Sequence, residues 1–360
     1  MAAKNRCISP DLLIHPGETI SDVIEERGIT QKELARRSGV SEAFLSDVIH
    51  GKKDISKGLA MGLEYSLGVP RSFWLNLQAN YDAELLGINE SDSIQKDEKD
   101  IFRKISEITD YLAELDYLPS DLSEDELILE SRRCLRVSNL TSLSTLVADY
   151  PVKEQSVLGA WLCLCKQISE DNRADRPFTR EQLNDLINEI KSTITSDTED
   201  ICKDLKSVFS NYGICLNIIH NFDSVPAQGY IAKLNDGTYQ LTVPVPDENE
   251  DTFLYTLFHE LGHIANGDIS RPGWFIDIPD TKGSEDKSAE RFANDSLMEQ
   301  NSYDLFVLQK VFTYAAITEY ARTQNVPPFV VVSRLQKEGI IPDSKYSRYR
   351  VRLNLPRTGS

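Results

Sequence analysis

The stretch TQKELARRSGVSEAFLSDVIHGK, residues 30–52, decides the fold of the N-terminal part of the chain. Thr30 and Ser41 stand directly before two short runs of helix-forming residues, and a side-chain oxygen at such a position caps the first turn of a helix. Gly39 lies between the two runs, where glycine permits the positive φ of a tight turn. The pattern therefore predicts two short helices joined by a glycine turn. In such a pair the second helix can present its N-terminal side chains to the major groove of DNA.

This stretch also resembles the helix-turn-helix family of Cro and the lambda repressor, through TQxELAxxSGV at residues 30–40 and LSxxIxGK at residues 45–52. HPGE at residues 15–18 and SFWLNLQ at residues 72–78, followed by Tyr and Asp at 81–82, more narrowly resemble the HigA antitoxin group. The resemblance implies a homodimer on double-stranded operator DNA, because one short helix reads too few bases alone.

The same resemblance implies which side chains meet the DNA. Groove contacts are expected from the N-terminal half of the second helix, at Ser41, Glu42, Ala43 and Ser46. Phosphate contacts are expected from Gln31, Lys52 and Lys53, since helix N-termini and flexible cations suit phosphates. The alternative is a helical bundle that makes only protein contacts. The acidic side chains of Glu42 and Asp47 on the second helix leave that alternative open.

The charge of the chain is unevenly distributed. The formal net charge is −18, which argues against a general nucleic-acid binder. However, the first sixty residues carry equal numbers of basic and acidic side chains, nine of each, so the whole excess of acid lies beyond them. The acidic remainder of the chain disfavours non-specific binding of DNA by the neutral N-terminal segment. The affinity for DNA must then come from dimerisation and from specific contacts.

Composition and segment length narrow the class of protein. The 360 residues allow two or three domains. No run of eighteen apolar residues exists, and the first ten residues lack the apolar core of a signal peptide. We therefore expect a cytoplasmic protein that does not enter the membrane. Its six cysteines form no CxxC pair, which favours reduced, mostly buried thiols.

Hydrophobic periodicity predicts an α+β fold that is mostly α. Residues 101–210 have helical spacing, residues 213–219 are a short apolar strand, and residues 228–243 form a hairpin with Asp236 and Gly237 at its turn. A long helix follows over 251–266, and the last sixty residues return to helix with a break at Pro327 and Pro328. We expect four regions: an all-α helix-turn-helix domain at 1–88, a helical middle at 89–205, a zincin-like α+β domain with a small antiparallel sheet at 206–300, and a helical extension at 301–360.

The motif His259-Glu260-Leu261-Gly262-His263 carries the strongest chemical signal in the chain. Residues four apart share one face of a helix, so both imidazoles can reach a single metal ion. Glu260 lies beside the pair, where a carboxylate can act as a base on water. HExxH also occurs by chance, and a buried helix with incidental histidines is the alternative. The preceding hairpin and the apolar surroundings favour a metal site.

The third ligand is suggested by resemblance to the ImmA/IrrE family of zinc metallopeptidases. Asn266 and Ile269 exclude the metzincin pattern. In ImmA/IrrE proteins a Glu at the start of an ExxA(N/D)xFA helix is the third ligand, and the matching run here is DKSAERFA at residues 286–293. This register puts Asp286 at the ligand position and Glu290 at a position that supports a ligand His. Asp is one methylene shorter than Glu, so Glu290 or Glu285 is an alternative ligand.

Two imidazoles and one carboxylate favour Zn²⁺ with an open position for water. The sequence thus supports a DNA-binding regulator with a zinc peptidase that hydrolyses a partner regulatory protein, such as a repressor. The second hypothesis is an antitoxin-like autorepressor that binds a toxin and has a vestigial zinc site. The third is a sensor in which zinc alters the DNA-binding domain without proteolysis. Glu260 favours the first hypothesis, and Asp286 in place of Glu favours the others.

Overall fold

The computed structural model describes residues 13–119, 121–170, 172–245, 250–278 and 284–346. The chain divides into two compact units, Met1–Gln95 and Lys96–Ser360. The predicted boundary between residues 88 and 89 falls at the end of the last long helix of the first unit. The predicted middle region lies within the second unit from residue 96 onward, and the predicted α+β and C-terminal regions lie wholly within it.

The first unit is an all-α domain, as the sequence predicts. Its helices are α1 (Pro16–Glu26), α2 (Gln31–Ser38), α3 (Glu42–Ile49), α4 (Lys57–Leu67) and α5 (Arg71–Asn89), followed by the short 3-10 turn η2 (Ser91–Ser93). Apolar residues from all five helices form one core, including Ile20, Leu34, Leu45, Leu63 and Trp74, each with no exposed surface. This core fixes α2 and α3 against α1 and α4. Packing therefore holds the helix pair α2 and α3 in place, together with the N-caps of the two helices.

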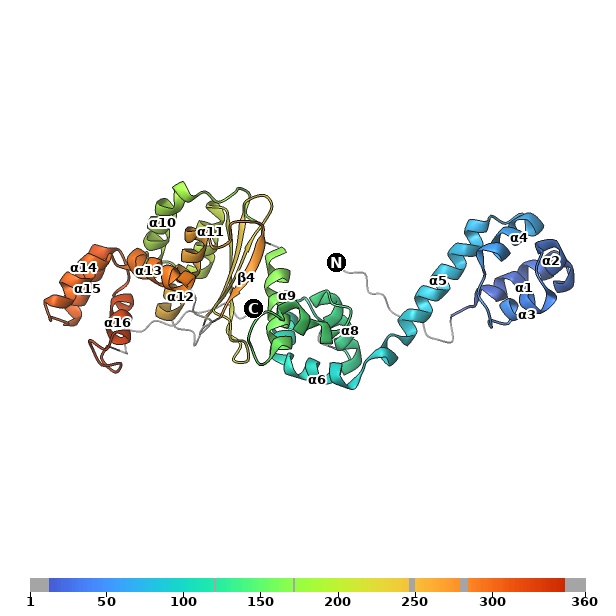
Figure 1. The fold of residues 1–360 in the computed structure, drawn as a ribbon, viewed down its shortest axis with the longest axis horizontal. Helices are drawn as coiled ribbons and strands as arrows, with labels where there is room; N and C mark the ends of the chain where they lie inside the picture. The colour runs from blue at the N-terminus through green and yellow to red at the C-terminus, as the bar shows by residue number, and fades with distance from the viewer. Residues whose placement is uncertain (1–12, 120, 171, 246–249, 279–283, 347–360) are drawn as a thin grey trace. The chain divides into compact units, whose positions relative to one another are not determined.

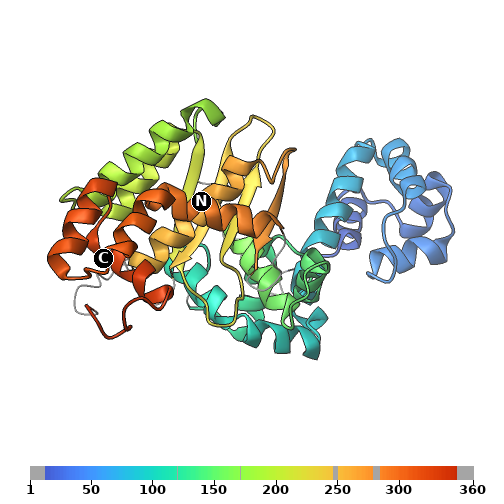
Figure 2. The ribbon, with the colours of Figure 1, turned by 60° about the vertical axis from the view of Figure 1, so that its left-hand side comes forward.

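The second unit begins with helices and ends with helices, with a small sheet between them (Figures 1 and 2). Before the sheet lie α6 (Lys96–Lys104), α7 (Ser106–Glu114), α8 (Glu124–Leu135), η3 (Leu140–Val147), α9 (Gln155–Glu170), η4 (Arg180–Gln182), α10 (Leu183–Thr195) and α11 (Ile201–Asn211). The last three helices are α14 (Gln300–Leu308), α15 (Tyr314–Gln324) and α16 (Pro328–Lys337). The predicted break between helices at Pro327 and Pro328 is confirmed.

The sheet has four strands in the order β1-β3-β2-β4, namely β1 (Ile214–His220), β2 (Gly229–Lys233), β3 (Tyr239–Val245) and β4 (Gly273–Asp277). The predicted hairpin corresponds to β2 and β3, which are antiparallel. β2 and β4 are also antiparallel, but β1 and β3 are parallel. The expected antiparallel sheet is therefore a mixed one. Because β2 and its two connections lie between β1 and β3 along the chain, β3 can run in the same direction as β1.

Helices cover both faces of this sheet (Figure 1). α12 (Glu250–Asn266) and α13 (Ser284–Leu297) pack together over one face, and α12 contacts β2 and β3. On the opposite face α9 contributes Ser169, which receives a hydrogen bond from Asn217 of β1 at 2.8 Å. Side chains alternate between the faces of a strand. Alternate residues of β2 and β4 therefore point toward α12, and this alternation selects the residues that can reach the motif on that helix.

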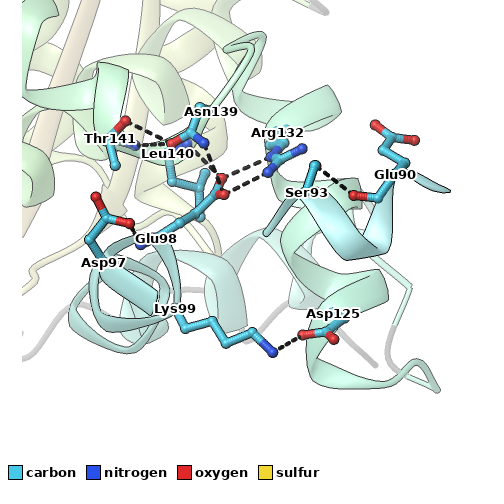
Figure 3. Close-up of polar contacts among 10 residues, drawn as sticks. All are labelled: Glu90, Ser93, Asp97, Glu98, Lys99, Asp125, Arg132, Asn139, Leu140 and Thr141. Atoms are coloured by element: carbon cyan, nitrogen blue, oxygen red, sulfur yellow. Dashed lines mark hydrogen bonds and ion pairs between the residues drawn. The ribbon is translucent and has the colours of Figure 1, made fainter. Parts of the chain in front are cut away.

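A buried carboxylate joins three elements at the start of the second unit (Figure 3). Glu98 of α6 has no exposed surface. Its Oε1 accepts hydrogen bonds from Arg132 Nε at 2.8 Å and from the Leu140 backbone N–H at 2.9 Å. Its Oε2 accepts from Arg132 Nη2 at 2.6 Å and from Asn139 Nδ2 at 3.0 Å. Four donors therefore satisfy one buried charge, and α6, α8 and the start of η3 are fixed to one another.

None of the helices in the described ranges combines the length and apolarity that a bilayer crossing requires. The five cysteines within those ranges are free, and four of them are buried. Cys7 lies outside the described residues. The expectation of reduced, mostly buried thiols agrees with this arrangement.

Candidate nucleic-acid interface and candidate metal centre

Capping and turn geometry set the angle between α2 and α3. The Thr30 hydroxyl accepts a hydrogen bond from the Glu33 backbone N–H at 3.2 Å, and the Ser41 hydroxyl accepts from the Phe44 backbone N–H at 3.1 Å. Gly39 between them has a φ of 72°, a left-handed conformation that disfavours a Cβ. The helix–turn–helix geometry predicted from residues 30–52 is present.

The N-terminal end of α3 is free of any role in the core. Ser41, Glu42 and Ala43 are exposed, and Ser46 is half-buried one turn further on. Gln31 at the start of α2 is half-buried, whereas Lys52 and Lys53 after α3 are exposed. Three of the residues predicted to contact DNA, Ser41, Glu42 and Ala43, are therefore exposed at one helix end. The fold leaves their side chains available for a partner.

Two cations of this surface are paired with acidic side chains of α3. Lys53 Nζ lies 2.9 Å from Asp47 Oδ2, and Lys32 Nζ lies 3.7 Å from Glu42 Oε1. The hydrogen bond from Lys53 is the main cause that lowers the pKa of Asp47 below its usual range. Phosphates must therefore compete with these carboxylates for the two lysines. Such exposed pairs are weak, so a phosphate can displace them.

The two histidines of the HExxH motif lie one turn apart on α12. Their Nε2 atoms face each other at 3.2 Å, and both residues are buried. His263 Nδ1 lies 2.7 Å from Asp268 Oδ2. Asp268 thus engages the Nδ1 side of the His263 ring and leaves Nε2 facing His259. Two ring nitrogens that converge in this way can both bind one metal ion.

Two aspartates complete this group of donors. Asp277 comes from the end of β4 and Asp286 from the first turn of α13. One donor atom each from His259, His263, Asp277 and Asp286 lies within 4.8 Å of the others. A shared ion with ligand distances of about 2.0–2.2 Å needs donors no more than about 4.4 Å apart. Small inward shifts of the carboxylates therefore fit Zn²⁺ to this group.

Glu260, the predicted base, is fully buried, and neither of its carboxylate oxygens has a hydrogen-bond partner among the described residues. Its carboxyl group lies against Gly229 of β2, where an added Cβ would come within 2.2 Å of Glu260 Cδ. Burial and the neighbouring Asp277 raise the pKa of Glu260 well above its usual range. Burial also opposes ionisation of Asp277, but interactions with His259 and Glu260 outweigh it and lower the pKa of Asp277.

The other predicted acidic candidates lie outside the donor group. Glu290 Oε1 accepts a hydrogen bond from the Tyr255 hydroxyl at 3.3 Å, and its side chain is 53% exposed. Glu285 is exposed and lines a cavity of about 460 Å³ beside His263 and Asp286. Helix α13 accounts for this difference, because positions 286 and 290 are one turn apart along its axis. The structure therefore brings Asp286, rather than Glu290 or Glu285, to the histidines.

Sequence reasoning missed Asp268 and Asp277. Asp268 lies two residues beyond the end of α12, so its nearness to the HExxH motif was a usable signal. Asp277 lies fourteen residues beyond His263 on a short strand, and no local pattern marks it. Only the register of β4 against β2, in which Asp277 pairs with Gly229, places it beside Glu260.

Replacing Asp268 by Asn is expected to weaken zinc binding by about 10–100-fold, the usual effect of losing a carboxylate that orients a ligand histidine. An amide can donate to His263 Nδ1 as well as accept from it, so the proton position on the ring is no longer fixed. Competition with a chromophoric chelator measures the change. Glu285→Gln, which removes an acidic group from the same cavity, is the control. Equal zinc affinity in the parent and Asp268→Asn would contradict this role for Asp268.

Comparison with known proteins places the first unit in a family. Residues 20–74 match the helix-turn-helix family model, whose members place the second helix of the pair in the major groove of DNA. Virulence-associated protein A′ of Dichelobacter nodosus is 35% identical over 82 residues, which cover 22% of this chain and 71% of that protein. The chain therefore belongs, through its N-terminal unit, to the helix-turn-helix family that includes this relative.

Two solved structures with similar segments are described as an antitoxin and an antidote protein. The antitoxin HigA of Pseudomonas aeruginosa, solved with the higBA promoter, is 30% identical and covers 23% of this chain and 97% of its own, with a TM-score of 0.21. An addiction module antidote protein of the HigA family from Coxiella burnetii is 24% identical and covers 23% of this chain and 96% of its own, also with a TM-score of 0.21. Both likenesses extend over less than a quarter of the chain.

Proposed function

We propose that this protein is a DNA-binding transcription regulator of the antitoxin type, and that its second unit binds one divalent metal ion. The exposed N-terminal end of α3, held by two caps and a glycine turn, is the observation that carries the first part. Side chains at such a helix end are free to read base edges, and the flanking lysines can meet phosphates. By this proposal the protein represses transcription from an operator.

The antitoxin resemblance suggests the remaining partners. An autorepressor of this type binds double-stranded operator DNA as a homodimer and binds a toxin protein. Dimeric helix-turn-helix proteins read two half-sites about 10 base pairs apart, or a multiple of that distance. We therefore propose an operator with two-fold symmetry. The proposed toxin is the partner whose release or capture changes repression.

Selection of genomic DNA fragments by the purified protein tests the DNA-binding proposal. The parent is expected to enrich a small set of sites with inverted repeats. Glu42→Gln combined with Ser46→Ala, at an exposed and a half-buried position of α3, should alter the enriched sequence without unfolding the domain. Recovery of fragments with no common sequence by the parent would contradict the proposed function.

The metal proposal rests on the donor set in the second unit. His259, His263 and Asp286 offer two imidazoles and a carboxylate, the ligand types that favour Zn²⁺. The unpartnered, buried oxygens of Glu260 and Asp277 beside them support a cation there, since a buried carboxylate without a partner is costly. By this proposal the ion links α12, β4 and α13.

A zinc metallopeptidase of the ImmA/IrrE type is the second candidate function, and Glu260 is the observation that favours it. Zinc bound by this group would supply a Lewis acid for a peptide carbonyl. Glu260 lies next to the ligand histidines, where a carboxylate can accept a proton from water and donate it to a leaving amine. The substrate in this case is a partner repressor protein. Cleavage that is lost in Glu260→Gln is the test of this candidate.

A further inference from the structure

Asp277 is the member of the donor group that comes from the sheet. It is the last residue of edge strand β4, and its side chain is 4% exposed. Its backbone carbonyl accepts a hydrogen bond from the Gln228 N–H at 2.8 Å, which continues the pairing of β4 with β2. Because Asp277 pairs with Gly229, both residues face α12. The strand therefore holds this carboxylate against the HExxH motif without the freedom of a loop.

The distances around Asp277 match a metal coordination sphere. Asp277 Oδ2 lies 3.3 Å from His259 Nε2, and the two histidine Nε2 atoms lie 3.2 Å apart. Four ligands at about 2.0–2.1 Å around tetrahedral zinc lie about 3.3 Å from one another. Both separations therefore equal the edge of such a tetrahedron. A carboxylate that only supported a histidine from outside the sphere would approach its Nδ1, as Asp268 does for His263.

The chemistry of the Asp277 oxygen also points to an ion. Oδ2 is buried and makes no hydrogen bond of good geometry within the described part of the chain. Burying such an oxygen without a partner is unfavourable. The neighbouring Glu260 carboxyl has at most one proton to donate. It therefore cannot provide a partner for Asp277 Oδ2 and for both of its own buried oxygens at the same time. A cation placed between Asp277, His259 and His263 resolves the conflict.

We propose that Asp277 is the fourth protein ligand, so that His259, His263, Asp277 and Asp286 form a closed tetrahedral metal site. This inference rests on the proposed metal binding and specifies what the site does. Catalytic zinc sites keep one position open for water or substrate, whereas structural sites are closed by four protein ligands. A closed site fixes α12, β4 and α13 to one another in response to metal. Peptide hydrolysis would first require Asp277 to leave the ion.

Cobalt substitution tests this coordination in the full chain. Four-coordinate Co²⁺ has strong visible absorption bands that change when an external anion such as azide binds to it. The parent loaded with Co²⁺ is expected to show a tetrahedral spectrum that azide leaves unchanged. In Asp277→Ala the opened position is expected to bind azide, with a shift of the bands. Asp277→Asn, which keeps the shape of the side chain, guards against misfolding, and circular dichroism checks both variants.

Zinc affinity provides a second measurement on the same proteins. Asp277→Ala is expected to weaken zinc binding by more than about 10-fold. Loss of a residue that only supports a ligand from outside the coordination sphere already weakens metal binding by about 10–100-fold. Glu285→Gln, on the same cavity, should leave the affinity unchanged. A parent spectrum that responds to azide as strongly as that of Asp277→Ala, together with equal zinc affinity, would overturn the closed site. Metal binding that is unaffected by His259→Ala would instead overturn the proposed metal centre itself.

Discussion

Replacing Glu98 by Ala is expected to lower the free energy of unfolding of the second unit by about 3–5 kcal/mol, the usual cost of removing one partner of a buried ion pair. The substitution removes the carboxylate that accepts two hydrogen bonds from Arg132, a residue that is 8% exposed. It also removes the acceptor for the Leu140 N–H and the Asn139 amide. Urea denaturation followed by circular dichroism measures the change, and the transition of the first unit serves as an internal reference.

An exposed pair in the same unit provides the control for Glu98. Arg136 and Glu170 also form a two-pronged ion pair, but their side chains are 63% and 38% exposed. Arg136→Ala is therefore expected to lower the free energy of unfolding far less than Glu98→Ala does. Equal effects of Glu98→Ala and Arg136→Ala would mean that the Glu98 network does not hold α6, α8 and η3 together.

The Glu98 network also predicts how stability depends on pH. Burial opposes ionisation of Glu98, but hydrogen bonds from Arg132, Leu140 and Asn139 outweigh it and lower the pKa of Glu98 in the folded state. A carboxyl with a lowered folded pKa contributes stability above its unfolded pKa, and that contribution is lost as pH falls through the folded pKa. Stability of the second unit should therefore decline less on acidification in Glu98→Ala than in the parent.

The double substitution Lys52→Ala and Lys53→Ala is expected to weaken DNA binding by about 60-fold at 0.1 M salt. Each phosphate contact contributes about 0.9 to the slope of log affinity against log salt, so two lost contacts reduce that slope by about 1.8. The loss should be similar for operator and unrelated DNA, because phosphates carry no sequence information. Fluorescence anisotropy over a range of salt concentrations measures both quantities.

A matched pair of lysines in the second unit controls for net charge. Lys203 and Lys206 are exposed on α11, and replacing both by Ala changes the total charge by the same amount. This control is expected to keep the DNA affinity and salt dependence of the parent. An unchanged salt slope in Lys52→Ala with Lys53→Ala would contradict the proposed placement of these lysines at phosphates.

Local signals were sufficient to predict the first unit. The caps at Thr30 and Ser41 and the turn at Gly39 act within a few residues, so the sequence contains the whole geometry of α2 and α3. The same holds for His259 and His263, whose shared face follows from helix periodicity alone. The helices before and after the sheet were likewise predicted from their periodicity and from the break at Pro327.

Long-range contacts limited the rest of the prediction. The parallel pairing of β1 with β3 depends on two segments that are not adjacent in the chain, so the sheet was expected to be antiparallel. Asp277 reaches the histidines only through the register of β4 on β2, which no spacing rule reveals. The burial of Glu98 depends on residues more than thirty positions away. Tertiary pairing, rather than local propensity, decides each of these features.

Elemental analysis of the purified full chain tests the proposed metal centre most directly. The parent, Glu260→Gln and His259→Ala are supplied with zinc, freed of excess metal and measured together. One zinc per chain is expected in the parent and in Glu260→Gln, because Glu260 lies beside the donors without being one of them. No retained zinc is expected in His259→Ala. A parent that holds no zinc after this treatment would refute the metal centre and leave the helix-turn-helix as the functional part of the chain.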